Sequence, residues 1–372
     1  MVTGGRADYG LLRPVMLEVR RRMALQVIAT GMHLVPAVGS TYREIERDGI
    51  VIDALVSSVV SGDDPPANAK SIGLGILGIT DALRRLRPDV ALILGDRSEI
   101  LAAAIAASFS GIVLGHVHGG DSPHGGYDEY ARHAITKLAH LHFPATAASA
   151  ERIARLGEPP EHIHVVGAPG LDSVLHAELP DSAALAERYG VETNRFILFV
   201  LHPLSTDPGS AADELRRVLE GTLAADLPVV AVYPNTDPGG DAMRRALEGL
   251  GDRVMARPNI AHLDYLALLR DCVALVGNSS SGIIEAPSFR TPVVNVGPRQ
   301  EGRERAANVL DAPIDAEAVG DAIRTALHDA GFRTRLAQVR NPYGDGTAAR
   351  RIVDVLESVE LGPELRRKRL TY

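Results

Sequence analysis

Short apolar runs alternate along the chain with longer segments in which apolar residues recur at helical spacing. Strands buried on both faces of a parallel sheet are apolar along their whole length, and the longer segments have the period of helices that cover such a sheet. This alternation predicts an α/β protein with parallel sheets and helices on both faces. The predicted strands are residues 1–3, 25–29, 90–94, 112–117, 164–166, 196–201, 229–233, 273–276 and 293–296.

The length of 372 residues favours two domains, because one hydrophobic core rarely serves a chain of this size. The strands up to residue 166 are assigned to a first domain and those from residue 196 to a second. Between them lies Gly167-Ala168-Pro169-Gly170, a sequence typical of a connection between domains. Near the end, an amphipathic helix is predicted at residues 348–359, followed by a charged and solvated tail.

One glycine motif matches the dinucleotide-binding fingerprint but stands in the wrong context. Residues 73–78 read GLGILG, yet the polar residues before them cannot form the strand that the fingerprint requires. The same glycines lie inside a helical pattern that runs to Leu86. We therefore expect a helix here and no nicotinamide cofactor.

Composition excludes several functional classes. The chain carries 39 basic and 47 acidic residues, a net charge of −8, and has no basic run interleaved with aromatics, so nucleic-acid binding is not expected. An anionic ligand must then be held by a local pocket. A single cysteine, Cys272, excludes a disulfide framework. With no signal-peptide pattern at the start and no apolar run of membrane-spanning length, a cytoplasmic location is expected.

The serine-rich turn at residues 277–282, GNSSSG, follows an apolar strand and precedes a short helical segment. Hydroxyls and backbone N–H groups at a helix start form an anion site. Arg299 and Arg303 follow the next strand, where side chains gather at the carboxyl edge of a parallel sheet. The simpler interpretation is that Ser279 only caps a helix. Three consecutive serines exceed what a cap needs, which favours phosphate binding.

Polar residues also follow the strands of the first half. Gly4-Gly5-Arg6 follows the first strand, and glycines there allow a ligand to approach the backbone closely. Asp96 and Arg97 follow the strand at 90–94, where either a functional role or a plain helix start fits the residues equally well. His202 ends the strand at 196–201, directly before a proline, which favours a position at the sheet edge.

The densest acid/base cluster is His116-Val117-His118-Gly119-Gly120-Asp121, followed by Asp128, Arg132, His133 and Lys137. His116 and His118 share one face of a strand, and Asp128 and Arg132 are spaced to pair on a helix. A surface ion pair is the simpler interpretation of the second pair. Metal binding is disfavoured, because strand histidines with a loop aspartate match no firm zinc spacing.

Seven segments in this order resemble the hydrolysing UDP-N-acetylglucosamine 2-epimerases, and the resemblance runs nearly end to end. The segments are GGRADYG, LGDRSE, HVHGGD, DEYARHAITKLAHLHF, LHPLSTD, GNSSSGIIEAPSFRTPVVNVGPRQEGR and NPYGDG. Non-hydrolysing relatives carry Arg-Pro-Glu after the first turn and lack the Asp-Arg pair. Arg6-Ala7-Asp8 and Asp96-Arg97 therefore favour the hydrolysing branch, of the type found in sialic-acid pathways.

The resemblance implies a GT-B-like fold, in which two Rossmann-like parallel-sheet domains face each other across a cleft. Domain 1 is expected at residues 1–168, joined by the C-terminal helix at 347–372, and domain 2 at residues 169–346. No cofactor or metal is implied, and a homo-oligomer, dimer or tetramer, is expected. The implied substrate-binding residues are Arg6, Asp8, Arg97, His202, Asn278, Ser279, Ser280, Ser281, Gly282, Glu285 and Arg299. The implied catalytic residues are Asp96, Asp121, Asp128, Arg132, His133 and His202.

The implied reaction is elimination of the diphosphate through a 2-acetamidoglucal and then hydration, which releases UDP and N-acetylmannosamine. One residue departs from the pattern: Asp121 stands where the family usually has Glu. Because small displacements of a base cost rate steeply, this exchange points to different tuning or to a different sugar. The rival substrate is UDP-2,4-diacetamido-2,4,6-trideoxyglucose. A GT-B glycosyltransferase and an inactive nucleotide-sugar binder are also compatible with the architecture, and three clustered acids disfavour both.

Overall fold

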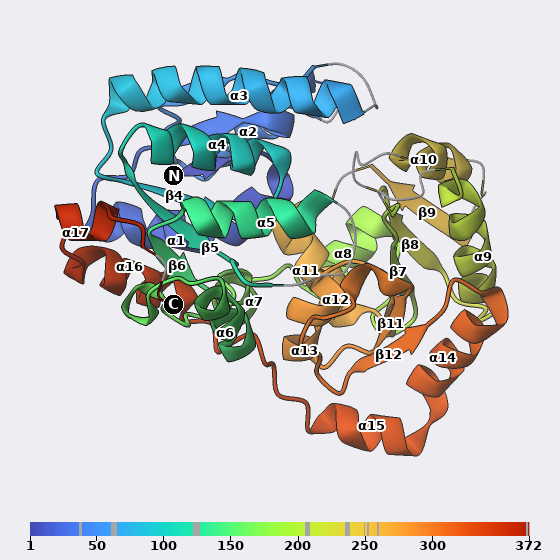
Figure 1. Ribbon diagram of the computed structural model, residues 1–372. Helices are drawn as coiled ribbons and strands as arrows, with labels where there is room; N and C mark the ends of the chain where they lie inside the picture. Colours follow the sequence, from blue (N-terminus) through green and yellow to red (C-terminus); the bar gives the residue numbers. More distant parts are fainter. Residues whose placement is uncertain are drawn as a thin grey trace. The chain divides into compact units, whose positions relative to one another are not determined.

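The computed structural model shows a chain built from two compact α/β units (Figure 1). It describes residues 1–36, 39–60, 65–121, 127–204, 209–234, 239–248, 250, 253–258, 260–369 and 371, and of residues 127 and 128 the backbone only. Unit 1 comprises Met1–Ser122, Tyr127–Ser173 and Tyr343–Tyr372, and unit 2 comprises Val174–Pro342. The predicted divisions at 168/169 and 346/347 lie within a few residues of these boundaries.

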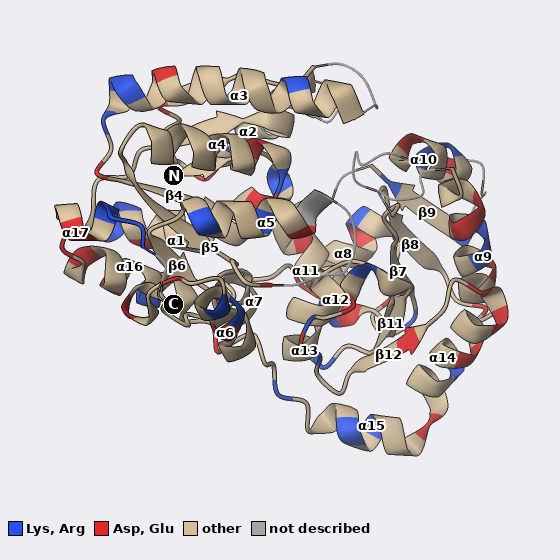
Figure 2. Cartoon of the chain, viewed as in Figure 1, with Lys and Arg blue, Asp and Glu red and all other residues tan. Residues whose placement is uncertain are grey.

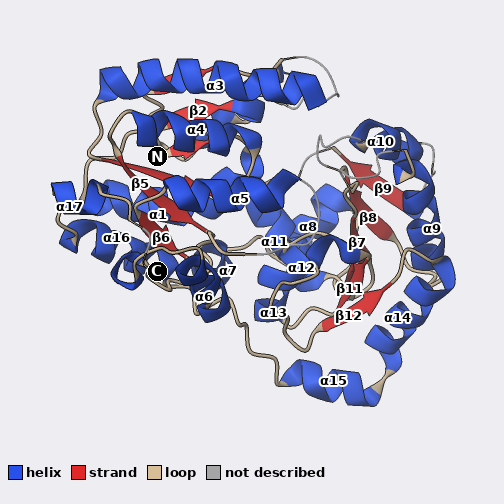
Figure 3. Ribbon diagram, in the orientation of Figure 1, coloured by secondary structure: helices blue, strands red, loops and turns tan. Residues whose placement is uncertain are grey.

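Unit 1 contains two three-stranded parallel sheets (Figure 3). The first has the order β1-β2-β3 and the second the order β4-β5-β6, and β1 and β4 lie in contact. The strands are β1 (Val2–Thr3), β2 (Ile28–Thr30), β3 (Ala54–Val56), β4 (Val90–Leu94), β5 (Val113–Val117) and β6 (Leu141–Phe143).

Helices cover both faces of these sheets because successive residues of each buried strand point to opposite sides. On one face, Leu92 and Leu94 of β4 pack with α1 (Arg6–Arg22) and α16 (Ala348–Ser358). On the other, Ala91 and Ile93 pack with α3 (Pro65–Leu86), α4 (Ser98–Phe109) and α5 (Tyr127–Leu138). The remaining helices of this unit are α2 (Tyr42–Arg47), α6 (Ala147–Arg155), α17 (Pro363–Arg366) and most of α7 (Gly170–His176), with short 3-10 turns η1 (Gly31–Leu34) and η3 (Pro160–His162).

The C-terminal helix α16 is held on unit 1 by polar contacts as well as by its apolar face. The carboxylate of Asp172 accepts hydrogen bonds from the backbone N–H groups of Ala348 (3.0 Å) and Ala349 (2.8 Å), which satisfies two donors at the helix start. Arg22 of α1 pairs with Asp354 at 2.7 Å. The last segment of the chain therefore completes the unit in which the chain began.

Unit 2 contains one six-stranded parallel sheet with the order β12-β11-β10-β7-β8-β9. Its strands are β7 (Ile197–Val200), β8 (Val229–Val232), β9 (Val254–Arg257), β10 (Ala274–Gly277), β11 (Val293–Val296) and β12 (Val309–Ala312). Residues from α9, α10 and α14 pack on one face, and residues from α8, α11 and α13 pack on the other. The helices are α8 (Ser182–Tyr189), α9 (Ala211–Leu223), α10 (Gly240–Glu248), α11 (His262–Asp271), α12 (Ser281–Ile284), α13 (Ala286–Phe289), α14 (Ala316–His328) and α15 (Ala330–Ala337), with the 3-10 turn η5 (Pro298–Gln300).

The predicted α/β class is confirmed, and most predicted strands match within one or two residues. The prediction at 164–166 was wrong: these residues form no strand, although His164 donates its backbone N–H to the His142 carbonyl at 2.9 Å. β3, β6, β9 and β12 were missed because they are short or carry polar residues. The GLGILG sequence lies inside α3, as predicted.

The surface charges are consistent with the modest net charge of the chain. Figure 2 shows basic and acidic residues interspersed along α9, α10 and α14. Many of them pair along their own helix, for example Arg244 with Asp241 at 3.0 Å. In the described part of the chain, none of the helices combines the length and apolar character needed to cross a membrane.

Two glycines make a matched test of the packing. Gly277, at the end of β10, has φ +140°, and a Cβ there would lie 2.0 Å from the backbone oxygen of Val200. Gly277→Ala should therefore lower the free energy of unfolding by about 3 kcal/mol or more. At Gly73, inside α3, no described atom outside the adjoining helix backbone lies within 4 Å of the Cβ position. Gly73→Ala should raise stability by about 0.5–1 kcal/mol. Urea unfolding of both variants measures the contrast, and equal effects would contradict it.

Candidate functional site

Arg132 of α5 is the centre of a polar cluster at the carboxyl ends of β4 and β5. Its side chain is only 4% exposed. One terminal nitrogen donates to the carboxylate of Asp96, which follows β4, and the other donates to the backbone oxygen of His118 at 2.6 Å, which follows β5. A buried guanidinium is stable only when its charge is paired and its donors are used. Arg132 thus holds the ends of two neighbouring strands in fixed positions.

Asp121 joins the same group through His118. Its Oδ1 accepts a hydrogen bond from the hydroxyl of Ser149 at 2.9 Å, and its Oδ2 lies 3.4 Å from His118 Nδ1. Both side chains are nearly inaccessible, at 3% and 5% exposure. Asp96, His118, Asp121 and Arg132 are called the carboxylate cluster below. Two of the three predicted catalytic acids, Asp96 and Asp121, lie in this cluster, and their catalytic role stays a prediction.

His118 was not among the predicted site residues, although its backbone is unusual. Its φ is +62°, in the left-handed region that side chains with a Cβ rarely adopt. Strain of this kind persists where the surroundings impose it, and it concentrates at functional sites. The His-Val-His-Gly-Gly sequence gave no sign of this conformation, because it depends on the contact of the His118 carbonyl with Arg132.

The next two predicted catalytic residues are Asp128 and His133. The side chain of Asp128 lies outside the described part of the structure. His133 follows Arg132 on α5, but its Nε2 bonds to Glu129 Oε1 at 3.0 Å, one turn earlier on the same helix. This ring contact is therefore with a helix neighbour and not with the carboxylate cluster. The catalytic role of His133 stays a prediction.

His116 is a structural residue. Its Nε2 lies 2.8 Å from the oxygen of Gly95, and its Nδ1 lies 3.2 Å from the hydroxyl of Thr136. Burial lowers the pKa of His116 to about 3, so the ring stays neutral at physiological pH. It links β5 to the turn after β4 and to α5, which helps to place Asp96.

The glycine turn after β1 is organised by two buried carboxylates. Asp8, predicted to bind substrate, accepts the backbone N–H groups of Gly4 and Gly5, each at 2.7 Å, and the hydroxyl of Thr3 at 3.1 Å. These contacts use both carboxylate oxygens to hold the turn from which Arg6 begins α1. Burial raises the pKa of Asp8 to about 6, although the Gly4 hydrogen bond opposes the shift.

Glu99 is the second carboxylate, and sequence reasoning did not single it out. It is 8% exposed and accepts from Arg97 Nε at 3.0 Å. A Cβ at Gly4 would lie 2.0 Å from Glu99 Cγ, so only glycine fits beside it. Burial tends to raise the pKa of Glu99, but the nearby charge and hydrogen bonds of Arg97 lower it below its usual value. Glu99 therefore stays ionised and orients the Arg97 guanidinium.

In unit 2, Asn278 organises the carboxyl end of β10. Its side-chain oxygen accepts the backbone N–H of His202, and its side-chain nitrogen donates to the His202 carbonyl, both at 2.8 Å. The backbone oxygen of Asn278 accepts from Gln300 at 2.9 Å and from Arg299 at 3.4 Å. Asn278 thus joins the ends of β7, β10 and β11, where three predicted substrate-binding residues meet.

The serine-rich turn differs from the predicted anion site in one respect. Helix α12 spans only Ser281–Ile284, so it has little dipole and the hydroxyls carry the polar character of the turn. Ser279 Oγ and Ser281 Oγ lie 3.0 Å apart, and Ser280 is the N-cap without a side-chain cap bond. Gly282 has a packing role, because a Cβ there would lie 2.8 Å from Val293 Cγ1.

Glu285 lies between α12 and α13 and is 6% exposed. Burial raises its pKa to about 7, against the opposing charge of Arg303. Among the residues that the structure describes, its Oε2 has no hydrogen-bond partner. A buried carboxylate with an open acceptor is suited to a ligand that brings hydroxyl donors.

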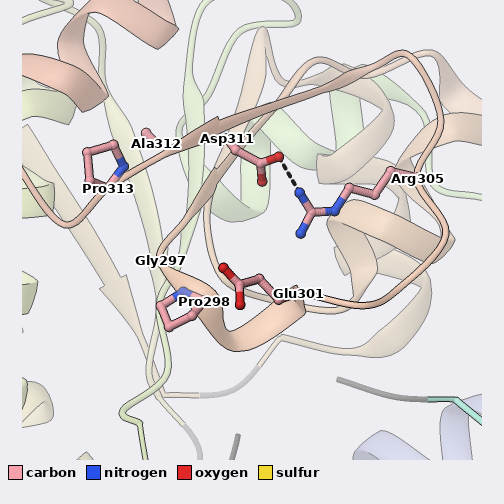
Figure 4. Close-up of a pocket in the computed structure, with 7 residues that line it drawn as sticks. All are labelled: Gly297, Pro298, Glu301, Arg305, Asp311, Ala312 and Pro313. Atoms are coloured by element: carbon pink, nitrogen blue, oxygen red, sulfur yellow. Dashed lines mark hydrogen bonds and ion pairs between the residues drawn. The ribbon is translucent and has the colours of Figure 1, made fainter. Parts of the chain in front are cut away.

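A cavity of about 410 Å³ lies beside this region, at the carboxyl ends of β11 and β12 (Figure 4). Its wall includes the ion pair between Arg305 and Asp311, and Glu301 points toward the same space. None of the predicted site residues lines it. Arg305 also donates to the Gln300 carbonyl at 3.0 Å, so the cavity wall supports the loop that carries Arg299.

Residues 16–357 match the family model described as UDP-N-acetylglucosamine 2-epimerase. The chain belongs to this family. It is 38% identical over 377 aligned residues to the UDP-N,N'-diacetylbacillosamine 2-epimerase (hydrolyzing) of Legionella pneumophila, covering 100% of this chain and 98% of that relative. It is 31% identical over 328 residues to the UDP-N-acetylglucosamine 2-epimerase of Neisseria meningitidis serogroup B, covering 87% and 86%.

Solved structures of the family confirm the fold class. The UDP-GlcNAc 2-epimerase from Neisseria meningitidis bound to UDP-GlcNAc superposes with a TM-score of 0.82 at 19% identity, covering 96% of this chain and 99% of that one. This likeness shows the GT-B-like α/β architecture with parallel sheets. Its membership of the family makes this chain a nucleotide-sugar 2-epimerase.

The raised pKa of Glu285 predicts that replacing this residue has opposite effects on the stability of the folded chain and on ligand binding. A carboxyl whose folded pKa is about 7 and whose ordinary value is 4.5 binds its proton more tightly in the folded state, so stability falls as pH rises through this window. Glu285→Gln should therefore raise the melting temperature of the ligand-free chain at pH 8. It should weaken UDP binding by about tenfold, the effect of losing a charged hydrogen-bond acceptor.

Calorimetry at pH 5 and pH 8 measures both effects. Glu187→Gln, at an exposed position of α8, is the control. A lower melting temperature for Glu285→Gln at pH 8 would show instead that the ionised carboxylate stabilises the folded chain.

Proposed function

We propose that the chain is a hydrolysing 2-epimerase that cleaves a UDP-sugar into UDP and the free C2-epimerised sugar. The favoured substrate is UDP-N,N'-diacetylbacillosamine, which is UDP-2,4-diacetamido-2,4,6-trideoxyglucose. UDP-N-acetylglucosamine is the second candidate. The observation that carries the reaction type is the carboxylate cluster after two adjacent strands. Arg132 donates to Asp96 and to the His118 carbonyl, and the His118 ring lies 3.4 Å from the buried carboxylate of Asp121.

The proposed nucleotide site is the polar group at the carboxyl end of β10 in unit 2. The serine hydroxyls and Arg299 offer donors for a diphosphate. The backbone oxygen of Asn278 accepts from Arg299, and Ser279 Oγ and Ser281 Oγ lie 3.0 Å apart, so these groups have partners before a ligand arrives. Preorganised donors stabilise the charge that grows on a departing diphosphate. The open acceptor of Glu285 suits the hydroxyls of a ribose. His202 is assigned to the same ligand, through its position at the end of β7.

The proposed chemistry is elimination followed by hydration. As the bond between C1 and the diphosphate oxygen breaks, a carboxylate takes the C2 proton and the electron pair forms the C1–C2 double bond of a glucal. Water then adds across this bond, with its oxygen at C1 and a proton at C2 on the opposite face. The two steps need one group that takes the C2 proton and one that delivers a proton to the opposite face of C2. Asp96, Asp121 and Asp128 are the proposed set, with Arg132 as the positioning residue.

Two observations support the diacetamido sugar. The relative named for that substrate is 38% identical over the whole chain, whereas the relative named for UDP-N-acetylglucosamine is 31% identical over 87% of it. In addition, Asp121 is shorter by one methylene than the Glu that the resemblance implies, which is consistent with a sugar seated differently at C2.

Turnover in deuterated water tests the proposal directly. Each UDP-sugar is incubated separately with the purified chain, and UDP and the free sugar are followed by NMR. We expect UDP and a C2-deuterated, C2-epimerised sugar, with kcat/KM at least about tenfold higher for the diacetamido substrate because its C4 and C6 groups distinguish the two. Faster turnover of UDP-N-acetylglucosamine would reassign the substrate. Release of an unlabelled, unepimerised sugar would contradict the reaction.

Asp121→Asn tests the acid/base role. The amide keeps the shape of the side chain but cannot exchange the proton, so kcat should fall by about a hundredfold or more while UDP affinity stays within about threefold. Ser149→Ala is the matched control, because it removes the 2.9 Å hydrogen bond to Asp121 and leaves the carboxylate. It should cost far less activity. Loss of UDP binding in Asp121→Asn would show that Asp121 is structural.

A further inference from the structure

A third hydroxyl lies behind the serine-rich turn, on a residue outside the implied site. Tyr265 comes from α11, and its hydroxyl is hydrogen-bonded to Ser281 Oγ. The Ser279 side chain also lies within hydrogen-bonding reach of this hydroxyl. Burial raises the pKa of the Tyr265 phenol, so it keeps its proton at neutral pH and acts as a donor.

The hydroxyls of Tyr265, Ser281 and Ser279 form one connected group. Each hydroxyl has one proton and two acceptor positions. The Tyr265 hydroxyl is bonded to Ser281 Oγ, and Ser281 Oγ lies 3.0 Å from Ser279 Oγ. Because a buried hydroxyl proton without an acceptor is costly, the serine oxygens take up the phenol proton, and Tyr265 limits the positions that the serine hydroxyls can adopt.

Ser279 is a member of this group that a ligand can reach, because it is partly exposed. Its oxygen lies 3.0 Å from Ser281 Oγ and receives the Ser281 backbone N–H at 3.4 Å. These contacts hold the Ser279 hydroxyl in one place at the surface of the turn. Hydrogen bonds in such a group polarise one another, which strengthens each of them.

We propose that Tyr265 is a positioning residue that holds the Ser279 hydroxyl in place for the diphosphate of the UDP-sugar. This inference rests on the proposed function, because it deepens the nucleotide site described there. Tyr265 does not itself touch the ligand. It acts through the hydroxyls of Ser281 and Ser279.

Tyr265→Phe tests this role, because it keeps the ring and removes only the hydroxyl. The affinities for UDP and for uridine are measured by calorimetry. We expect UDP to bind about fivefold more weakly, the equivalent of one neutral hydrogen bond, and uridine to bind unchanged. Tyr189→Phe is the matched control, since it removes another tyrosine hydroxyl of unit 2, one that donates to Asp264 at 2.7 Å. It should leave both affinities unchanged.

A double-mutant cycle with Ser279→Ala separates the possible failures. If Tyr265 acts through Ser279, adding Tyr265→Phe to Ser279→Ala should weaken UDP binding no further. Fully additive losses, or an equal loss for uridine and UDP, would overturn the positioning role while leaving the nucleotide site intact. If Ser279→Ala alone leaves UDP affinity unchanged, the proposed phosphate contact itself is wrong, and the inference fails with it.

Discussion

A parallel strand with both faces covered has only its ends available for polar side chains, and this limit shapes both units of the chain. β4, β5, β7, β10 and β11 are buried along almost their whole length. Polar groups within them would lose their hydration without gaining a ligand. The chemistry of the chain is therefore concentrated in the turns that follow the strands. Both the carboxylate cluster of unit 1 and the serine-rich turn of unit 2 occupy such turns.

Burying charged groups in these turns requires internal partners, and the partners determine the geometry. The almost inaccessible Arg132 donates to Asp96 and to the carbonyl of His118, a residue whose backbone lies in the left-handed region. Asp8 and Glu99 have a similar role at the first turn, where one holds the backbone and the other holds Arg97. Many of the polar groups thus support other polar groups, which keeps donors and acceptors in place before any ligand binds.

In the proposed nucleotide site of unit 2, side-chain hydroxyls and amides take the place of the dipole that the N-terminus of a long helix provides. Because α12 is a single turn, its hydroxyls and the neighbouring Asn278 and Gln300 have to supply what a helix dipole would otherwise provide. The hydroxyl chain from Tyr265 is one consequence of this short helix. Glu285 is another feature of the same turn: its pKa lies near neutrality, and its Oε2 has no hydrogen-bond partner among the described residues. Such a group is costly in the free protein and becomes favourable only in contact with a ligand.

The α/β class, most of the strands, the helix around GLGILG and the family could all be predicted from the sequence, because these depend on periodicity and on residues that are close together in the chain. The same reasoning placed Asp96 and Ser279 directly after strands, Asp121 in the loop after the glycines, and Glu285 on the short helix. The folded chain was needed to show which side chains support the site and which are directed to a ligand. Asp8 holds its own turn, His116 is buried as a neutral ring, and Glu99 and Tyr265 act through partners that a linear pattern does not reveal. Hydrogen-bond partners, burial and pKa shifts arise between residues far apart in sequence, and local pattern carries no information about those pairs.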